Sequence, residues 1–313
     1  MSLIESTYKA KDTEEWLDIK FYRPFGYLIA RACEKIKVTP NSVSFTGMFL
    51  GVLAGCLFYY SGFMFTLAGI ILLIISEAMD SADGQLARMT NRKSRLGRIL
   101  DGFVTNVIFL SIYISLCLRL ALDGSQLVWL VALLSALSHS LQSAVADHYR
   151  NGYLHFVVSP DKSELDSSVK IAGQFRRLKW NREPLQKFWA LLYLNYTREQ
   201  EMLSPRFSEL RQKTEDIFQG ILPSHLSQLY RGYTFRQIKF YNILTTNTRM
   251  ICLFIALIVK IPWIYFAFEI IVLNGLLLHV VIYHEMASDS ILKLLKQFEK
   301  QEEVQEEEEI SIC

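Results

Sequence analysis

Apolar residues in this chain gather in six runs separated by polar or charged stretches. A helix needs about 20 predominantly apolar residues to span the hydrocarbon layer of a bilayer. The runs approach this length and lack the alternation of a soluble amphipathic strand, so the pattern predicts an all-α polytopic membrane bundle. The expected spans cover residues 43–60, 63–79, 99–122, 127–147, 242–259 and 263–283.

Polar segments divide the chain around these spans. Between Trp16 and Ile36, aromatic and aliphatic side chains are mixed with cations. This mixture predicts an amphipathic helix in the membrane interface, although a core-facing helix of a soluble cap has the same pattern. The expected divisions are an N-terminal cytosolic segment and interfacial helix (1–42), four spans (43–147), a cytosolic helical insertion (148–241), two spans (242–285) and an acidic tail (286–313).

The insertion shows two helical patterns, near Pro184 to Met202 and Pro205 to Ile221, each opened by a proline. Its aromatic residues fit two arrangements equally well, a belt at the membrane interface or the core of a small cytosolic cap. The glutamate-rich tail is expected to be solvated or disordered.

Cations are distributed unevenly between the two ends of the expected bundle. The connections near residues 61–62, 123–124 and 260–262 are short and nearly free of them, whereas residues 88–98 and 176–182 are rich in arginine and lysine. The positive-inside bias therefore predicts that the cation-rich end and both termini face the cytoplasm.

The composition narrows the class of partner. The 313 residues are 51% hydrophobic with a formal net charge of only +2, so no overall basic field favours nucleic acid. The five cysteines show neither a metal-site spacing nor a disulfide framework. The first sixteen residues are polar and lack the apolar segment of a cleavable secretory signal, so insertion is expected to depend on the spans themselves.

Three carboxylates stand at the junction of the second and third spans, where lipid would ordinarily exclude them. The chain reads D-S-A-D-G-Q-L-A-R from Asp80 and, eight residues later, G-R-I-L-D from Gly97. Residues three or four apart share a helix face, which places Asp80 with Asp83 on one helix and Asp101 on the next. Such carboxylates stay ionised together only when a cation neutralises them, so this segment predicts a metal site.

This string resembles the signature of the CDP-alcohol phosphotransferases (CDP-alcohol phosphatidyltransferases), D-x2-D-G-x2-A-R-x8-G-x3-D-x3-D. The resemblance implies a homodimeric membrane enzyme that transfers a substituted phosphate from a CDP-linked lipid to an acceptor hydroxyl and releases CMP. The last position departs from the family, because Thr105 stands where a fourth Asp is expected. The positions that match in register are Asp80, Asp83, Gly84, Ala87, Arg88, Gly97 and Asp101.

The resemblance also implies roles for the matching residues. Asp80, Asp83 and Asp101 hold Mg2+ or Mn2+, which neutralises the diphosphate and makes CMP a tolerable leaving group. Arg88 binds the cytidine diphosphate through its planar guanidinium. Small residues let the nucleotide approach the helix backbones; they are Gly84, Ala87 and Gly97.

Thr105 cannot accept the proton of the attacking hydroxyl near neutral pH, as the fourth Asp would. A phosphate on the acceptor could assist its own deprotonation, and the amide of Asn106 could help to bind metal or substrate. Otherwise the protein binds a CDP-lipid without turning it over. The candidate replacement bases are Glu77, one helical turn before Asp80, and His279, His284 and Glu285 at the end of the last span.

The acceptor is interpreted as a polyol such as inositol or inositol phosphate. The alternatives are transfer from a CDP-polyol to a lipid alcohol and a catalytically silent relative that binds CDP-lipid. A multi-pass carrier would also have six spans, but carriers usually show repeated halves, and the chain has no convincing internal repeat. Four cations between the motif halves could hold an acceptor phosphate, although the positive-inside bias alone accounts for their presence at this end of the bundle. They are Arg92, Lys93, Arg95 and Arg98.

Overall fold

The computed structural model describes residues 10–92, 95–122, 124 and 126–312, and every regular element among them is helical. Six of these helices or continuous helical runs are long and apolar enough to cross a membrane. The predicted all-α polytopic bundle is therefore confirmed, and the chain is an integral membrane protein. The six candidate spans are Pro40–Leu57, Phe63–Met89, Ile99–Ala121, Val128–Val158, Ser224–Ile258 and Trp263–Gln297.

The second span is longer than its apolar run. Helix α3 (Phe63–Met89) continues ten residues beyond Met79, so the first half of the motif lies on the same helix as the span. The helix ends where Asn91 adopts a left-handed conformation with φ of 54°. The Arg92 amide then donates to the Ala87 carbonyl at 2.9 Å, which satisfies a terminal backbone acceptor.

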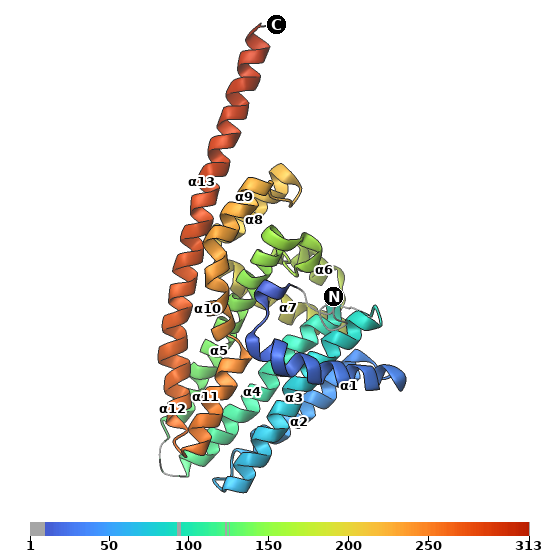
Figure 1. Cartoon of the computed structure of the whole chain (residues 1–313), viewed down its shortest axis with the longest axis vertical. Coiled ribbons are helices and arrows are strands. Elements are labelled where there is room, and N and C mark those ends of the chain that lie inside the picture. Colours follow the sequence, from blue (N-terminus) through green and yellow to red (C-terminus); the bar gives the residue numbers. More distant parts are fainter. Residues whose placement is uncertain (1–9, 93–94, 123, 125, 313) are drawn as a thin grey trace.

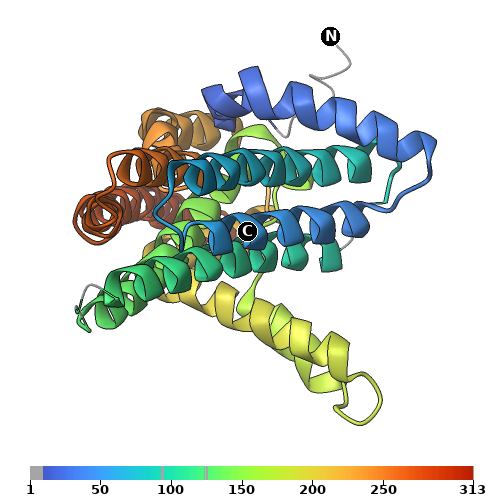
Figure 2. The same ribbon diagram turned by 90° about the horizontal axis from the view of Figure 1, so that it is seen from below.

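Helix α1 (Arg23–Lys35) packs against α3, which lies between it and α2 (Pro40–Leu57) in the view of Figure 2; Figure 1 shows the same helices from the side. Its closest approach to α3 is at Gly26, where a Cβ atom would lie 2.9 Å from both Ser81 Oγ and Gln85 Nε2. On the outside of the helix, Phe25 and Leu28 are 49% and 65% exposed. A helix packed on one side with apolar side chains exposed on the other has the pattern of an interfacial helix.

Helices α2, α3 and α4 (Arg95–Ala121) form a closely packed unit. Helix α2 begins at Pro40, where the Thr39 hydroxyl accepts from the Ser42 amide at 3.3 Å. Small residues then bring the helices together, as expected for helices that pack in lipid. A Cβ atom at Gly51, for example, would lie 2.6 Å from Ile108 Cδ1 of α4. This packing fixes the relative position of the two helices that carry the motif.

The polar insertion is helical. The two proline-opened helices are confirmed as α7 (Pro184–Leu203) and α8 (Pro205–Phe218), while α6 (Ser168–Arg177) and α9 (Ser224–Thr234) were not predicted. The aromatic residues of the insertion differ in exposure. Tyr193 is buried, whereas Trp180 and Phe188 are exposed, so these residues do not all belong to one core. The flanking elements are α5 (Val128–Tyr153), η4 (Leu154–Val158), η5 (Pro160–Lys162), η6 (Phe235–Gln237) and α10 (Ile238–Ile243).

The last spans are joined to α5 by a buried ion pair. Arg249 of α11 (Thr246–Ile258) donates to Glu269 at 2.6 Å and to the Gln142 side chain of α5 at 2.8 Å. Both charged side chains are fully buried. The final helical run comprises α12 (Trp263–Ala267), η7 (Phe268–Leu273), which holds Glu269, and α13 (Asn274–Ile312), which projects far beyond the bundle (Figure 1).

Candidate functional site

An open cleft of about 230 Å³ lies between the N-terminal segment and helices α3, α4 and α5. Seven carboxylates and three guanidinium groups line it, which leaves a formal charge of −4 when all are ionised. An excess of negative charge in a confined space favours the binding of cations. The charged lining residues are Glu14, Asp18, Glu77, Asp80, Asp83, Asp101, Asp147, Arg23, Arg88 and Arg150.

The three motif carboxylates meet in this cleft. Asp80 and Asp83 come from α3 and Asp101 from α4, and all three line the same space. The side chains of Asp80 and Asp101 lie within hydrogen-bonding reach of each other. Asp83 is held by the hydroxyl of Ser44, which donates to its Oδ2 atom. Helix spacing and close packing of α2, α3 and α4 thus bring the carboxylates to one place.

The donor set suits a hard divalent cation. Two adjacent carboxylates repel each other unless a proton or a cation lies between them, and carboxylate oxygens are the ligands that Mg2+ and Mn2+ prefer. As the side chains stand, no group of three His, Cys, Asp or Glu within the described ranges encloses a metal position. The negative charge of the cleft and its carboxylate ligands therefore suit a divalent metal ion. The described side chains do not already enclose a position for that ion.

The other motif residues are distributed unevenly around the cleft. Gly84 and Arg88 line it, and the guanidinium of Arg88 folds over Gly84, where a Cβ atom would lie 3.5 Å from both Nη atoms. The Nε atom of Arg88 is buried and has no hydrogen-bond partner in the described part of the chain. Ala87 and Gly97 are half-buried and are not among the lining residues.

Thr105 lies beside the cleft in an adjoining cavity of about 20 Å³. Its hydroxyl donates to the Asp101 carbonyl at 3.2 Å, so it makes a helix-internal contact. Glu77 and Asp80 line both this cavity and the larger cleft. Asn106 is exposed and donates to the Gly102 carbonyl at 2.8 Å.

The remaining candidate bases make other contacts. His284 is buried, stacks on Tyr149 and lies 3.0 Å from the Tyr230 hydroxyl. Glu285 accepts from the first backbone amides of α8, and His279 packs against aromatic rings. None of these three lines the cleft, so its geometry does not favour them as bases.

Of the four cations between the motif halves, only the side chain of Arg92 lies within the described residues. Arg92 is exposed in the turn after α3 and is not among the cleft's lining residues. Lys93 and the side chains of Arg95 and Arg98 lie outside the described residues.

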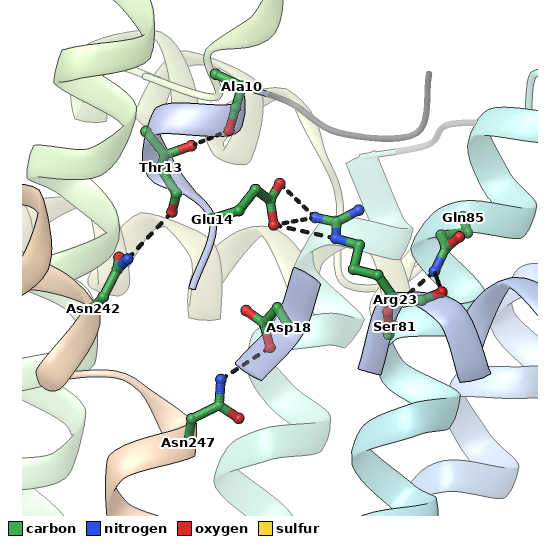
Figure 3. A network of polar contacts seen from close by, with 9 residues as sticks. All are labelled: Ala10, Thr13, Glu14, Asp18, Arg23, Ser81, Gln85, Asn242 and Asn247. Atoms are coloured by element: carbon green, nitrogen blue, oxygen red, sulfur yellow. Dashed lines mark hydrogen bonds and ion pairs between the residues drawn. The ribbon is translucent and has the colours of Figure 1, made fainter. Parts of the chain in front are cut away.

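One wall of the cleft comes from the N-terminal segment, which contains η2 (Lys11–Thr13) and η3 (Asp18–Tyr22) and which the motif did not predict. Glu14 forms a two-pronged ion pair with Arg23, with Nη2–Oε1 and Nε–Oε2 distances of 2.6 and 3.1 Å (Figure 3). Gln85 of α3 donates to the Arg23 carbonyl at 3.0 Å and so fixes this wall to the motif helix. The only sequence signal was an acidic stretch ahead of an amphipathic helix.

Two carboxylates of the N-terminal segment, Asp18 and Glu15, have pKa values raised by their surroundings. Burial raises the pKa of Asp18. Burial, together with the negative charge of Asp18, also raises the pKa of Glu15. Tyr22, which lines the cleft nearby, has a raised pKa because it is buried and faces Glu77 and Asp18. Such shifts are frequent at functional sites.

Comparison with known families covers the motif helices. Residues 37–155 match the family model described as CDP-alcohol phosphatidyltransferase. The match spans less than half of the 313-residue chain, so this segment is similar to the CDP-alcohol phosphatidyltransferase family. The family consists generally of metal-dependent transferases that use a CDP-alcohol and an acceptor alcohol. Comparison with curated proteins gave no match.

The matched segment includes α2 to α5 and all seven matching motif positions. The wall formed by Glu14, Asp18 and Arg23 precedes residue 37 and lies outside it. The cleft is thus assembled from helices that match the family model and from a segment that the model does not cover.

Proposed function

We propose that the protein transfers a substituted phosphate from a CDP-linked lipid, similar to CDP-diacylglycerol, to an acceptor hydroxyl and releases CMP in phospholipid synthesis. The observation that carries this proposal is the convergence of Asp80, Asp83 and Asp101 in one open cleft beside Arg88. The family match over residues 37–155 supports the same reaction class.

Asp80, Asp83 and Asp101 would hold Mg2+ or Mn2+. When bound, the cation supplies neutralising charge to the diphosphate and to the departing CMP. The Ser44 hydroxyl orients Asp83, and the Arg88 guanidinium, whose Nε atom has no partner among the described residues, can donate to phosphate oxygens. Gly84 leaves room over which this guanidinium can move.

The attacking hydroxyl must lose a proton, and Thr105 cannot accept it. Four carboxylates line the cleft besides the three motif residues, so the site does not lack suitable groups. On the motif helices this group is Glu77; the others are Glu14, Asp18 and Asp147.

The cleft favours a polar acceptor. Nearly all of its lining side chains are charged or carry hydroxyl or amide groups, with Leu154 as an aliphatic exception. A hydroxyl-rich molecule such as inositol or inositol phosphate can form hydrogen bonds with these groups, whereas an acyl chain would desolvate them. We therefore place the lipid chain on the CDP-linked donor; transfer from a CDP-polyol to a lipid alcohol is the opposite assignment.

Incubation of the purified protein with CDP-diacylglycerol, Mn2+ and a panel of acceptors tests the proposal. The expected result is release of CMP that requires both the metal and a polyol acceptor. Release with CDP-inositol and diacylglycerol instead would reverse the substrate assignment. The panel should include inositol, inositol phosphate, glycerol phosphate and serine.

A second candidate function follows from Thr105. A relative that lacks the fourth carboxylate could bind CDP-lipid and act as a silent scaffold. Tight binding of CDP-diacylglycerol without CMP release from any acceptor would favour this function over the transferase.

We also propose that the cleft faces the cytoplasm and that the protein is a homodimer. The arginine- and lysine-rich connection after α3 lies at the cleft end of the bundle, which supports the orientation. A cysteine placed at Asn91 should react with an impermeant maleimide only from the cytoplasmic side. The parent protein, which lacks this cysteine, is the control.

Light scattering of the protein in detergent tests whether it is a homodimer.

A further inference from the structure

Asn247, at the start of α11, holds two carboxylates side by side. Its Nδ2 atom lies 2.8 Å from Glu15 Oε2 and 2.9 Å from Asp18 Oδ1, and its side chain is buried (Figure 3 shows the Asp18 contact). The hydroxyl of Thr245 donates to the other oxygen of Glu15. Two like charges held side by side and half-buried cost free energy, and such pairs are frequent at functional sites.

The two carboxylates face different spaces. Asp18 lines the cleft that contains the motif carboxylates, whereas Glu15 lines a neighbouring groove of about 630 Å³. Only the Oδ1 atom of Asp18 accepts the Asn247 hydrogen bond, and no described residue donates to its Oδ2 atom. The second oxygen of Asp18 is therefore available to a ligand in the cleft.

We propose that Asp18 accepts the proton of the acceptor hydroxyl, in place of the carboxylate that Thr105 does not provide. This inference rests on the proposed transferase function and assigns a role to a residue outside the matched segment 37–155. The N-terminal segment then completes a site that the motif alone leaves without its usual base.

The step balances as follows. The hydroxyl oxygen forms a bond to the β-phosphorus of the CDP-linked donor, and its proton passes to Asp18 Oδ2. The bond from that phosphorus to the bridging oxygen breaks, and CMP leaves with the electron pair. Asp18 later releases the proton to water through the open cleft, so no other reactant is needed.

Charged groups around Asp18 are consistent with this role. Glu14 raises the pKa of the carboxyl further, whereas Asn247, Arg23 and Arg150 lower it, and burial is the largest influence. Glu15 and Glu77 are the other acids near this group. A base is most effective when its pKa approaches the working pH, so a raised carboxyl pKa suits proton transfer near neutrality.

Glu77 is less suited to the same task. It lies one turn from Asp80 on α3, next to the motif carboxylates. A divalent cation bound there would lower the pKa of neighbouring carboxyls and weaken them as bases. Asp18 comes from a separate element, and its position is set by Asn247.

The Asp18→Asn variant tests the proposal in the full-length protein with CDP-diacylglycerol, Mn2+ and the best acceptor. We expect kcat to fall by about 10²- to 10⁴-fold, as for loss of a general base. CDP-diacylglycerol binding, measured by calorimetry with Mn2+, should stay within threefold of the parent protein. Asp18→Glu should restore at least a tenth of the parent kcat. The matched control is Asp216→Asn, which changes an exposed aspartate on α8.

The Asn247→Ala variant gives a second measurement. It keeps the Asp18 carboxyl but removes a hydrogen bond that lowers its pKa, so the acidic limb of the pH–rate profile should move to higher pH. An unmoved limb would contradict the role of Asp18, because loss of packing alone does not displace that limb.

The outcomes separate this inference from the transferase function. If the parent protein releases CMP and Asp18→Asn keeps kcat within threefold, only the Asp18 assignment is overturned. If the Asp18→Asn variant binds CDP-diacylglycerol more than tenfold more weakly than the parent protein, Asp18 is a binding residue. The assignment of Asp18 as the base is then overturned as well. If the parent protein releases no CMP with any acceptor, both the inference and the proposed function fail.

Discussion

The carboxylates of the cleft obtain their properties from the helices that hold them. Asp80 and Asp101 lie on different spans, yet their side chains come within hydrogen-bonding reach. An isolated carboxylate at such a position would be costly in lipid, whereas a pair with a bound cation is stable. The motif residues are therefore best tested by changes that remove charge and preserve shape.

Asp101→Asn should reduce CMP release by about 100-fold or more and raise the Mn2+ concentration needed for half-maximal rate, because a neutral amide is a weaker ligand for a hard cation. Asp216→Asn serves as the exposed control. A rate and metal requirement equal to those of the parent protein would show that Asp101 holds no catalytic metal.

Thr105→Asp, made in the Asp18→Asn background, should recover CMP release by about tenfold or more, since it returns a carboxylate to a position next to Glu77 and Asp80. Thr105→Asn in the same background is the size-matched control and should recover nothing. Equal rates for the two double variants would contradict the idea that Asp18 substitutes for the missing motif carboxylate.

At the scale of helices, the cleft depends on how α1 docks against α3. Gly26 permits the close approach, and Gln85 binds the Arg23 carbonyl at the same contact. Movement of α1 would displace Arg23 and its partner Glu14 from the cleft wall. Packing at a residue remote from the motif thus controls the shape of the site.

Gly26→Val should lower the apparent Tm and reduce CMP release, because the added side chain would overlap Ser81 and Gln85 and overpacking costs about 1–3 kcal/mol. Thermal unfolding followed by fluorescence in detergent measures the first effect. The control is Gly173→Ala on α6, where a Cβ meets no atom within 4 Å and alanine favours the helix. A Gly26→Val protein as stable as this control would refute the packing argument.

Much of the helical layout could be predicted from local pattern. Apolar runs located the spans, and prolines located the starts of α7 and α8. The helical spacing of Asp80 and Asp83 also indicated that the second span continues as a helix through its polar end, and α3 does so. The cleft wall was missed, since Asp18 and its partner Asn247 are 229 positions apart and no short-range rule pairs them.

At the scale of the whole molecule, distant parts of the chain are joined by buried polar contacts. The Arg249–Glu269 pair connects the last two spans, and Gln142 extends it to α5. The Asn247 contacts connect α11 to the N-terminal segment. These links hold the insertion-flanking spans in place around the motif helices.

Glu269→Ala should destabilise the protein by about 3–5 kcal/mol, because it leaves the Arg249 charge buried without a partner. The double change Arg249→Met with Glu269→Leu should recover most of the lost Tm, since neither charge then remains. If Glu269→Ala unfolds at the parent temperature, the pair contributes little to stability.

Glu15→Gln should change how stability depends on pH. The pKa of Glu15 is raised on folding by burial and by Asp18, so its stabilising contribution is complete below the ordinary Glu value of about 4.3 and is lost as pH rises through the raised pKa. Thr245, Asn247 and Arg150 oppose this shift. The Tm of Glu15→Gln relative to the parent should therefore increase between pH 4 and pH 8. A difference that is constant with pH would contradict the raised pKa.

The placement of Glu14, Asp18 and Arg23 ahead of the family segment limits how the protein can be shortened. A version that starts at Pro24 would retain all six candidate spans and the seven matching signature positions. It would nevertheless lack one side of its reaction chamber. Inactivity of such a shortened enzyme would report the missing side and would say nothing against the signature carboxylates.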